Sequence, residues 1–306
     1  MATESLTDAE PIDADFEDAP WTHGSAEFDD VDIHYVEAGP SDGPIVVLLH
    51  GFPECWWTWH HQIPALAEAG FHVVAMDMRG ANRSSKPASA GSYGPDHLAG
   101  DVLDLIEHFG GQSARIVGHD FGGLVAWHLG HVHSDAVERL AVLNSPHLSV
   151  YGHHLTTLAQ LRRSWYVGYF QIPKIPEWGL ARDDFAIFES IYDGTVDPDA
   201  LTTDDVERLR RAFARPGTPT GVVNWYRGVG RWYARELFRA RGVPEYPVDV
   251  PTLLCWGEDD EALVPALVAD HHDWIGDLRV ERFPEASHWV HFEEREAVTA
   301  ALLDHL

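Results

Sequence analysis

The chain has 306 residues, of which 45% are hydrophobic, so it can bury a sizeable core as one large domain or a domain with an insertion. Its 49 acidic side chains outnumber the 21 lysines and arginines and give a formal net charge of -28. That charge repels nucleic-acid backbones and anionic membranes, so we expect neither as a partner.

The charge is distributed unevenly along the chain. Residues 146–241 carry 13 basic and 11 acidic side chains, whereas the rest of the chain carries 8 and 38. Lys86 and Lys174 are the only lysines, and this acidic, arginine-rich composition resembles that of proteins from salt-loving organisms. Molar salt shortens the Debye length to about 3 Å and screens self-repulsion, so we expect stability to fall on desalting.

The first 20 residues are rich in Asp, Glu, Ala and Pro without apolar periodicity, which predicts a disordered or loosely attached acidic tail at residues 1–20. No basic residue precedes Arg79, and no apolar run approaches the roughly 18 residues of a membrane span. Cys55 and Cys255 are too few for a disulfide framework, so we expect both to be reduced. These features predict a soluble, cytoplasmic protein.

From Val31 onward, apolar runs alternate with helical stretches. Four runs are predicted as buried parallel strands, at residues 45–49, 73–76, 115–117 and 140–143. Residues 95–109 place an apolar stripe on one helical face, and a second helix is predicted at 121–129. The alternation predicts an α/β protein with a doubly wound, mostly parallel sheet.

The alternation stops after Pro146, and a strand is next predicted only at residues 251–256. The segment between them, rich in Trp, Tyr and Arg, is predicted as an inserted helical cap at residues 146–241. The cap divides the core into two parts, residues 21–145 and 242–306. A further strand and a terminal helix are predicted in the second part, at residues 278–283 and 290–303.

Residues 118–123, GHDFGG, stand between the third predicted parallel strand and the helix that follows it. Their pattern is that of the strand-to-helix elbow of the α/β-hydrolase fold, whose glycines permit a tight turn that exposes the central side chain. Neither the G-x-G-x-x-G nor the G-K-[ST] phosphate-binding pattern is present here. Asp120 is therefore the predicted nucleophile, and the ester that it forms must later be hydrolysed.

A carboxylate nucleophile needs a base that delivers water to the ester. Among 20 histidines, His288 is selected by its position in the loop after the last predicted strand. Asp260, in the loop after the preceding strand, is the candidate that holds the imidazole tautomer and stabilises its charged form. Three neighbouring carboxylates are alternatives to it or surface groups: Glu258, Asp259 and Glu261.

The order nucleophile, acid, histidine is that of α/β-hydrolases, and the three candidates obey it. The segment HGFP at residues 50–53 follows the first predicted parallel strand, where this fold places one oxyanion donor. The backbone N–H groups of Phe52 and Phe121 are therefore predicted to point at one oxygen and form the oxyanion hole.

With these segments the chain resembles the epoxide hydrolases of the α/β-hydrolase superfamily, from about residue 25 to the C-terminus. Three segments look like core signatures of that family: HGFPE at 50–54 with Trp56 and Trp59, MRGANRSSKP at 78–87, and GHDFGG at 118–123.

The family uses two cap tyrosines to hold or protonate the epoxide oxygen opposite the nucleophile. Tyr166 matches the first, by its spacing to Tyr-Phe-Gln, and Tyr226 matches the second in NWYR at 224–227. Tyr169 is expected to serve in packing. The resemblance also implies substrate contacts from Trp56 and Trp165.

The resemblance implies a two-step reaction that needs no metal or organic cofactor. Asp120 attacks an epoxide carbon while the two tyrosines hydrogen-bond the ring oxygen. Water activated by His288 then cleaves the ester and releases a vicinal diol. The aromatic cap indicates a small, largely apolar epoxide, with water as the second substrate.

Haloalkane and haloacid dehalogenases share the nucleophile and the base, and they are the principal alternative. They must stabilise halide, but Phe52 and Phe121 have no side-chain donor where a haloalkane dehalogenase has Asn and Trp. A haloacid enzyme of the fluoroacetate type would carry arginines beside the nucleophile, where this chain has Phe121 and Leu124. Less favoured are an esterase, for which the nucleophilic serine is absent, and a ligand receptor without catalysis.

Overall fold

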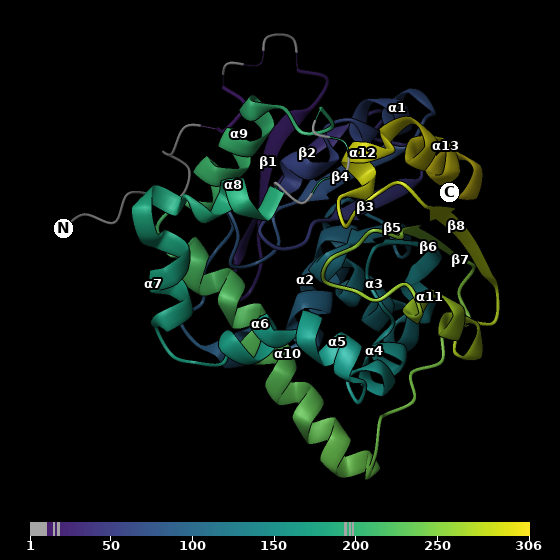
Figure 1. The fold of residues 1–306 in the computed structure, drawn as a ribbon. Coiled ribbons are helices and arrows are strands. Elements are labelled where there is room, and N and C mark those ends of the chain that lie inside the picture. The colour runs from purple at the N-terminus through teal and green to yellow at the C-terminus, as the bar shows by residue number, and fades with distance from the viewer. Residues whose placement is uncertain (1–10, 15, 17–18, 193–194, 196, 198) are drawn as a thin grey trace.

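The computed structural model describes residues 11–14, 16, 19–192, 195, 197 and 199–306, and an eight-stranded sheet lies at its centre (Figure 1). The strands lie in the order β1-β2-β4-β3-β5-β6-β7-β8. Their bounds, from β1 to β8, are Thr22–Glu27, Asp32–Ala38, Ile45–Leu49, His72–Met76, Ala114–His119, Val137–Leu143, Thr252–Gly257 and Leu278–Phe283. The predicted parallel strands are confirmed. The edge strand β1 and its neighbour β2 were not predicted, because polar residues interrupt their apolar pattern.

Strands β3 to β8 pair in parallel, and β1 and β2 form an antiparallel edge. Strands β3 and β5 are neighbours in the sheet although β4 lies between them in the sequence. The chain therefore reverses its winding direction between β3 and β5. Ligands of open α/β sheets bind beyond the carboxyl ends of the strands at such a point. The segments that follow β3 and β5 carry Phe52 and Asp120. These two residues therefore lie together at the point of reversal.

Helices cover both faces of the sheet. Helix α3 packs on β5 and β6 and contacts α2. Helix α1 packs on β4, α13 packs on β6 and β7, and α1 and α13 contact each other. The core helices α1, α2, α3, α11, α12 and α13 span Gln62–Glu68, Pro95–His108, Asp120–Val132, Leu267–Asp270, Val290–Glu293 and Arg295–His305. The terminal helix predicted at 290–303 is interrupted at Glu294, whose φ of -114° and ψ of 37° are not helical.

The segment between β6 and β7 is helical, as predicted for the cap. Its helices α4 to α10 span Leu148–His154, Leu158–Arg163, Trp165–Tyr169, Ile175–Ala181, Ile187–Tyr192, Thr203–Phe213 and Thr218–Ala240. Five short 3-10 helices occur in the described chain, at Trp56–Trp59, Ala90–Tyr93, Ser134–Ala136, Arg182–Phe185 and His271–Asp273. None of the helices in the described residues combines the length and apolar character needed to cross a membrane.

Part of the predicted acidic tail is attached to the body of the molecule. Ile12 and Asp13 are buried, and the Asp13 carboxylate accepts hydrogen bonds from Trp21 Nε1 at 2.7 Å and His23 Nε2 at 3.0 Å. The prediction of a loose tail is therefore wrong for these two residues. Residues 1–10, 15 and 17–18 of that tail lie outside the described residues.

Candidate active site

Asp120 stands at the turn where β5 ends and α3 begins. Its φ of +48° is in the left-handed region, where a non-glycine residue is strained, and this turns the carboxylate away from the strand direction. The turn also needs a close approach of backbones, because a Cβ on Gly122 would lie 2.3 Å from the Leu49 carbonyl oxygen. The GHDFGG pattern therefore forms the elbow that was predicted from the sequence.

The three predicted members of the triad meet at the carboxyl edge of the sheet. His288 Nδ1 lies 2.7 Å from Asp260 Oδ2, and His288 Nε2 lies 3.5 Å from Asp120 Oδ2. Since Asp260 follows β7 and His288 follows β8, adjacent parallel strands deliver the two side chains to the nucleophile. The neighbouring carboxylate Glu258 instead pairs with Arg282 on β8.

Asp260 is fixed by donors as well as by His288. Its Oδ1 accepts from the backbone N–H groups of Ala262 and Leu263 at 2.7 and 2.9 Å, and its Oδ2 accepts from Asn144 Nδ2 at 2.9 Å. Burial opposes ionisation, but the His288 charge and these hydrogen bonds keep the pKa of Asp260 below its usual value. Sequence reasoning missed Asn144, whose only signal is its place directly after β6.

The pKa of His288 is shifted in the opposite direction to that of Asp260. Burial favours the neutral imidazole, but the charge of Asp260 and hydrogen bonds to Asp120 and Asp260 raise the pKa of His288 well above its ordinary value. In the resting site the imidazole is therefore held as a cation between two carboxylates. This cation depends on the Asp120 charge, which a covalent ester on Asp120 removes.

One predicted oxyanion donor is aimed at the nucleophile. The Phe52 N–H donates to Asp120 Oδ1 at 2.8 Å. Gly51 permits this approach, because a Cβ there would lie 2.4 Å from the Asp120 Cβ. Phe121, the second predicted donor, is the residue after Asp120 in the first turn of α3, where backbone N–H groups are without intrahelical partners. The other carboxylate oxygen, Oδ2, faces His288.

Two cavities meet at the triad. A smaller cavity of about 140 Å³ and a larger one of about 720 Å³ both include Asp120, His288 and the predicted tyrosines Tyr166 and Tyr226 in their walls. Most of the other lining side chains are apolar, with Leu124, Leu148, Leu155, Val167, Val229 and Leu263 in the smaller cavity. Such a site suits an apolar molecule that reacts at one polar centre.

Tyr166 on α6 and Tyr226 on α10 face each other, with ring centroids 5.9 Å apart at an interplanar angle of 84°. Burial, reinforced by nearby groups that include Asp120, raises both pKa values well above that of free tyrosine, so both hydroxyls remain protonated donors. The structure thus brings the two predicted cap donors together opposite the nucleophile, although 60 residues separate them in the chain.

The two predicted tryptophan contacts differ. Trp165 lines the wider cavity, as does Tyr169, whose hydroxyl lies 3.4 Å from the Ile175 carbonyl oxygen. Trp56 does not line either cavity: it is fully buried and packs edge to face against Trp21 and Trp57. The expected substrate contact from Trp56 is therefore wrong, since its indole belongs to an aromatic cluster in the core.

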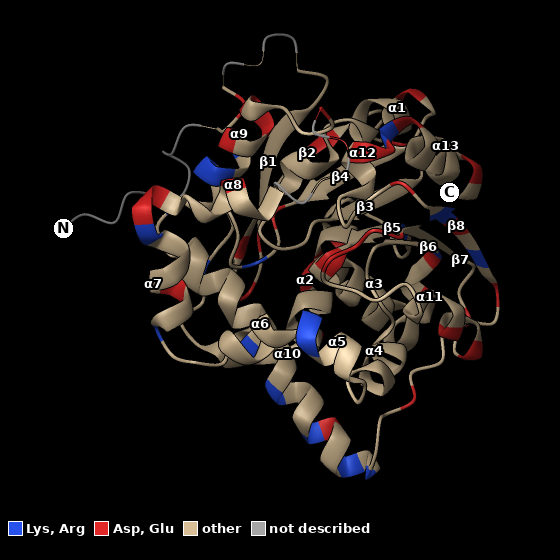
Figure 2. Ribbon diagram, in the orientation of Figure 1, with Lys and Arg blue, Asp and Glu red and all other residues tan. Residues whose placement is uncertain are grey.

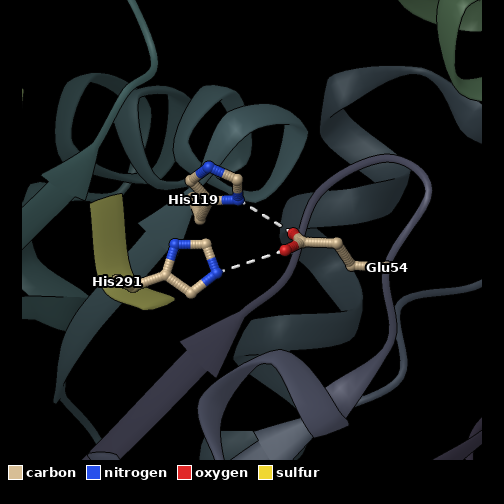
Figure 3. A group of neighbouring side chains, drawn as sticks. All are labelled: Glu54, His119 and His291. Atoms are coloured by element: carbon tan, nitrogen blue, oxygen red, sulfur yellow. Dashed lines mark hydrogen bonds and ion pairs between the residues drawn. The ribbon is translucent and has the colours of Figure 1, made fainter. Parts of the chain in front are cut away.

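A third carboxylate and two histidines, Glu54, His119 and His291, form a cluster (Figure 3) that adjoins the triad through His119. Glu54 Oε2 lies 2.8 Å from His119 Nδ1, and Glu54 Oε1 lies 3.2 Å from His291 Nε2. The His119 ring also reaches the triad, because its Nε2 lies 2.9 Å from the His288 carbonyl oxygen. All three side chains are fully buried, and Thr58 Oγ1 adds a hydrogen bond to Glu54.

The hydrogen-bond partners determine where the protons of this cluster lie. A carbonyl oxygen only accepts, so His119 donates a hydrogen bond from Nε2 to the His288 carbonyl oxygen. Burial opposes ionisation of Glu54, but the charges and hydrogen bonds of His119 and His291 hold the pKa of its carboxyl well below the usual value. Burial, with the His119 charge, lowers the pKa of His291 to about 4, so that ring is neutral.

The ligand atoms of Glu54, His119 and His291 lie within 4.8 Å of one another, a spacing compatible with a metal ion. The contacts between them are hydrogen-bond distances of 2.8 and 3.2 Å, shorter than the roughly 3.3 Å expected between tetrahedral ligands of zinc at about 2.0 Å. The donor set therefore fits a proton-sharing network better than a metal site.

A family model described as the alpha/beta hydrolase fold matches residues 44–295 of the chain. The AB hydrolase superfamily protein YfhM of Bacillus subtilis is 36% identical over 90% of this chain and 94% of its own length. Epoxide hydrolase 4 of Mus musculus is 32% identical over 88% of this chain and 74% of its own length.

Two solved epoxide hydrolase structures resemble the fold closely. The enzyme of Bacillus megaterium superimposes with a TM-score of 0.84 at 28% identity and covers 92% of this chain and 99% of its own. Epoxide Hydrolase A of Mycobacterium thermoresistibile gives a TM-score of 0.79 at 30% identity, with 94% and 98% coverage.

Proposed function

The chain belongs to the epoxide hydrolases of the α/β-hydrolase superfamily, and from this premise we propose that it converts an epoxide into a vicinal diol through an ester on Asp120. The observation that carries the proposal is that Tyr166 and Tyr226 share their cavities with Asp120 and His288. A carboxylate nucleophile and two protonated phenols in the walls of one apolar cavity suit a neutral electrophile whose leaving group is an alkoxide.

In the first step, Asp120 Oδ2 attacks an epoxide carbon and the carbon–oxygen bond of the ring breaks. The ring oxygen takes a proton from one tyrosine and accepts a hydrogen bond from the other, which leaves a tyrosinate and a neutral hydroxyalkyl ester. Asp120 Oδ1 is held by the Phe52 N–H at 2.8 Å, which supports Oδ2 as the attacking atom.

Formation of the ester prepares the second step. Because the ester is neutral, His288 loses one of the two carboxylate charges that raise its pKa, so the imidazolium gives its proton to the tyrosinate left by the first step and becomes a neutral imidazole that can act as a base. His288 then takes a proton from water as the water oxygen attacks Cγ of Asp120. The resulting oxyanion at Oδ1 is stabilised by the N–H groups of Phe52 and Phe121.

Collapse of that intermediate breaks the bond between Cγ and Oδ2, so Oδ2 leaves in the diol and the water oxygen stays on Asp120. His288 gives the proton that it took from water to the leaving alkoxide, and the proton of the regenerated Asp120 carboxyl passes to His288, which restores the imidazolium and the Asp120 carboxylate. The sum of both steps is epoxide plus water to diol, without metal or organic cofactor.

Single-turnover hydrolysis of an aryl or alkyl epoxide in oxygen-18 water tests this route. We expect the label in the peptide that contains Asp120 and an unlabelled first diol, measured by mass spectrometry. Direct attack of water on the epoxide predicts label in the first diol instead. Halide release from haloalkanes without diol from any epoxide would favour a dehalogenase.

We also propose a cytoplasmic location. The supporting observation is that Cys55 and Cys255 are both buried and unpaired, as suits a reducing compartment. Cell fractionation with an antibody to the chain measures the compartment directly.

A further inference from the structure

The C-terminal part of α10 projects away from the rest of the molecule (Figure 1). All buried residues of this helix lie between Thr218 and Val229. Beyond them, Trp232 still packs on His128 and Tyr246, with ring centroids 5.6 and 5.7 Å apart. From residue 234 to residue 241 every side chain is exposed except the half-buried Glu236. We name residues 231–241 the arm.

The arm is basic although the protein is strongly acidic. It holds four arginines and one glutamate, a charge of +3, in a chain whose net charge is -28. Figure 2 shows the basic positions along this helix and acidic positions spread over the core. Arg231, Arg235 and Arg239 are spaced four residues apart and share one helical face. Glu236 pairs only with Arg239, at 2.6 Å, among the described residues.

Helix electrostatics account for only part of this pattern. Cations stabilise the C-terminal end of a helix dipole, but the effect falls off within the last turn. Arg231 and Arg235 lie further back and make no ion pair within the described chain. The dipole also gives no reason for Phe238, whose side chain is 86% exposed.

An uncovered helical extension of this length has little stability of its own. Isolated helices shorter than about 12–15 residues are marginal in water, and most helices are stabilised by packing of an apolar face. Leu237 and Phe238 offer apolar surface near the tip of the arm, and Phe238 is not covered by any of the residues that the structure describes. A partner that is acidic and offers apolar contact would stabilise the arm.

We propose that the arm docks on the acidic core surface of a second copy of this chain and forms a homodimer. Outside residues 146–241 each copy carries 38 acidic and 8 basic side chains, which complement the arginines of the arm. Contact between the two arms is disfavoured because both are positive. A two-fold arrangement instead gives two equivalent contacts, each between the arm of one copy and the core of the other.

Sedimentation velocity at several protein concentrations, in buffer of moderate ionic strength, tests the dimer. We expect the unaltered chain to be dimeric and the triple variant R231E/R235E/R239E to be monomeric at the same concentrations. The matched control R139E/R162E/R295E makes the same change in net charge at three exposed arginines that lie outside the arm and outside both cavities, and it should remain dimeric. Circular dichroism and epoxide turnover check that each variant is folded.

A second variant separates the apolar contact from the charges. Phe238→Ser leaves the charge unchanged and should weaken the dimer, because it removes the apolar contact at the tip of the arm. A monomeric unaltered chain at every concentration overturns the proposal. It is equally overturned if the arm variant stays dimeric or if the control variant dissociates as completely as the arm variant. None of these outcomes depends on the proposed reaction, which is measured separately by diol release.

Discussion

At the scale of single residues, the protonation of His288 depends on the charges of the two carboxylates beside it. His288 lies between the Asp120 and Asp260 carboxylates, and these two charges favour its cationic form. Esterification of Asp120 leaves only Asp260 beside the ring. In the proposed reaction, ester formation therefore shifts His288 toward the neutral form that the second step requires.

Replacing that base should trap the covalent intermediate. In His288→Gln, Asp120 can still attack the epoxide, but no imidazole remains to take a proton from water. We expect the protein to gain the mass of one epoxide and to stop after one equivalent, as measured by intact-protein mass spectrometry. His97→Gln, which changes an exposed histidine far along the chain, should turn over normally. An H288Q protein that releases diol repeatedly contradicts the assignment.

The two tyrosines should act together on ring opening. Removal of one donor to a developing oxyanion costs roughly 10²–10³-fold in rate, so Tyr166→Phe or Tyr226→Phe should slow ester formation by about that factor. The double variant should nearly abolish it, as measured by single-turnover kinetics. Tyr169→Phe is the matched control from the same helix and should have little effect. Unchanged turnover in the double variant would remove both residues from the mechanism.

The buried pair of Glu54 and His119 should make stability depend on pH. The folded pKa of Glu54 is lowered from an unfolded value of 4.5, so its contribution is present above about pH 4.5 and is lost as pH falls toward the folded pKa. Breaking a buried ion pair costs about 3–5 kcal/mol, so Glu54→Gln should be destabilised by that order at neutral pH. The difference from the unaltered chain should shrink in acid, as measured by denaturant unfolding. A difference that does not change with pH indicates packing rather than charge.

At the scale of elements, the elbow joins β5 to α3 so closely that a side chain cannot be inserted at Gly122. A methyl group there would meet the Leu49 carbonyl oxygen of β3 at 2.3 Å, and neither backbone is free to move in the sheet centre. Overpacking of this kind costs about 1–3 kcal/mol.

We therefore expect Gly122→Ala to lower the unfolding free energy by at least about 1–3 kcal/mol and to displace Asp120, reducing turnover. Gly168→Ala is the control, because a Cβ at this exposed helical glycine meets nothing within 4 Å and no positive φ is involved. It should leave stability unchanged or raise it by about 0.4–1 kcal/mol. Thermal unfolding followed by circular dichroism measures both variants. Equal stability of the two variants contradicts the close-packed elbow.

At the scale of the whole molecule, charge is the dominant property. A net charge of -28 on 306 residues generates self-repulsion that dilute buffer does not screen. The charge is also distributed unevenly, because a near-neutral segment, residues 146–241, with its basic arm is joined to a strongly acidic core.

This charge predicts salt-dependent stability. Thermal midpoints should be lower in dilute buffer than in molar potassium chloride, since the Debye length falls to about 3 Å at 1 M salt. Differential scanning fluorimetry across a salt series measures the shift. Equal midpoints at both ends of the series contradict the halophilic character inferred from composition.

Much of the fold could be predicted because its signals are local. A buried parallel strand such as β3 is a continuous apolar run, and the elbow is a compact motif with a fixed pattern of glycines. Strands β1 and β2 were missed because polar side chains such as His34 and Glu37 interrupt the apolar run, and the buried His34 is satisfied by a contact with the distant Asp77. The break at Glu294 and the attachment of Asp13 through Trp21 and His23 depend on contacts that no local pattern encodes.

The sequence by itself determined the kind of nucleophile, the order of the triad candidates and the two tyrosines to consider, since these rest on residue identity and spacing. Only the tertiary structure decided which residues meet. It brought Tyr166 and Tyr226 to the cavities at Asp120, turned Trp56 into the core instead, and added Asn144 and the Glu54 cluster behind the triad. The physical reason is that burial and hydrogen bonding arise between elements that are distant in the chain, and periodicity along one segment does not specify them.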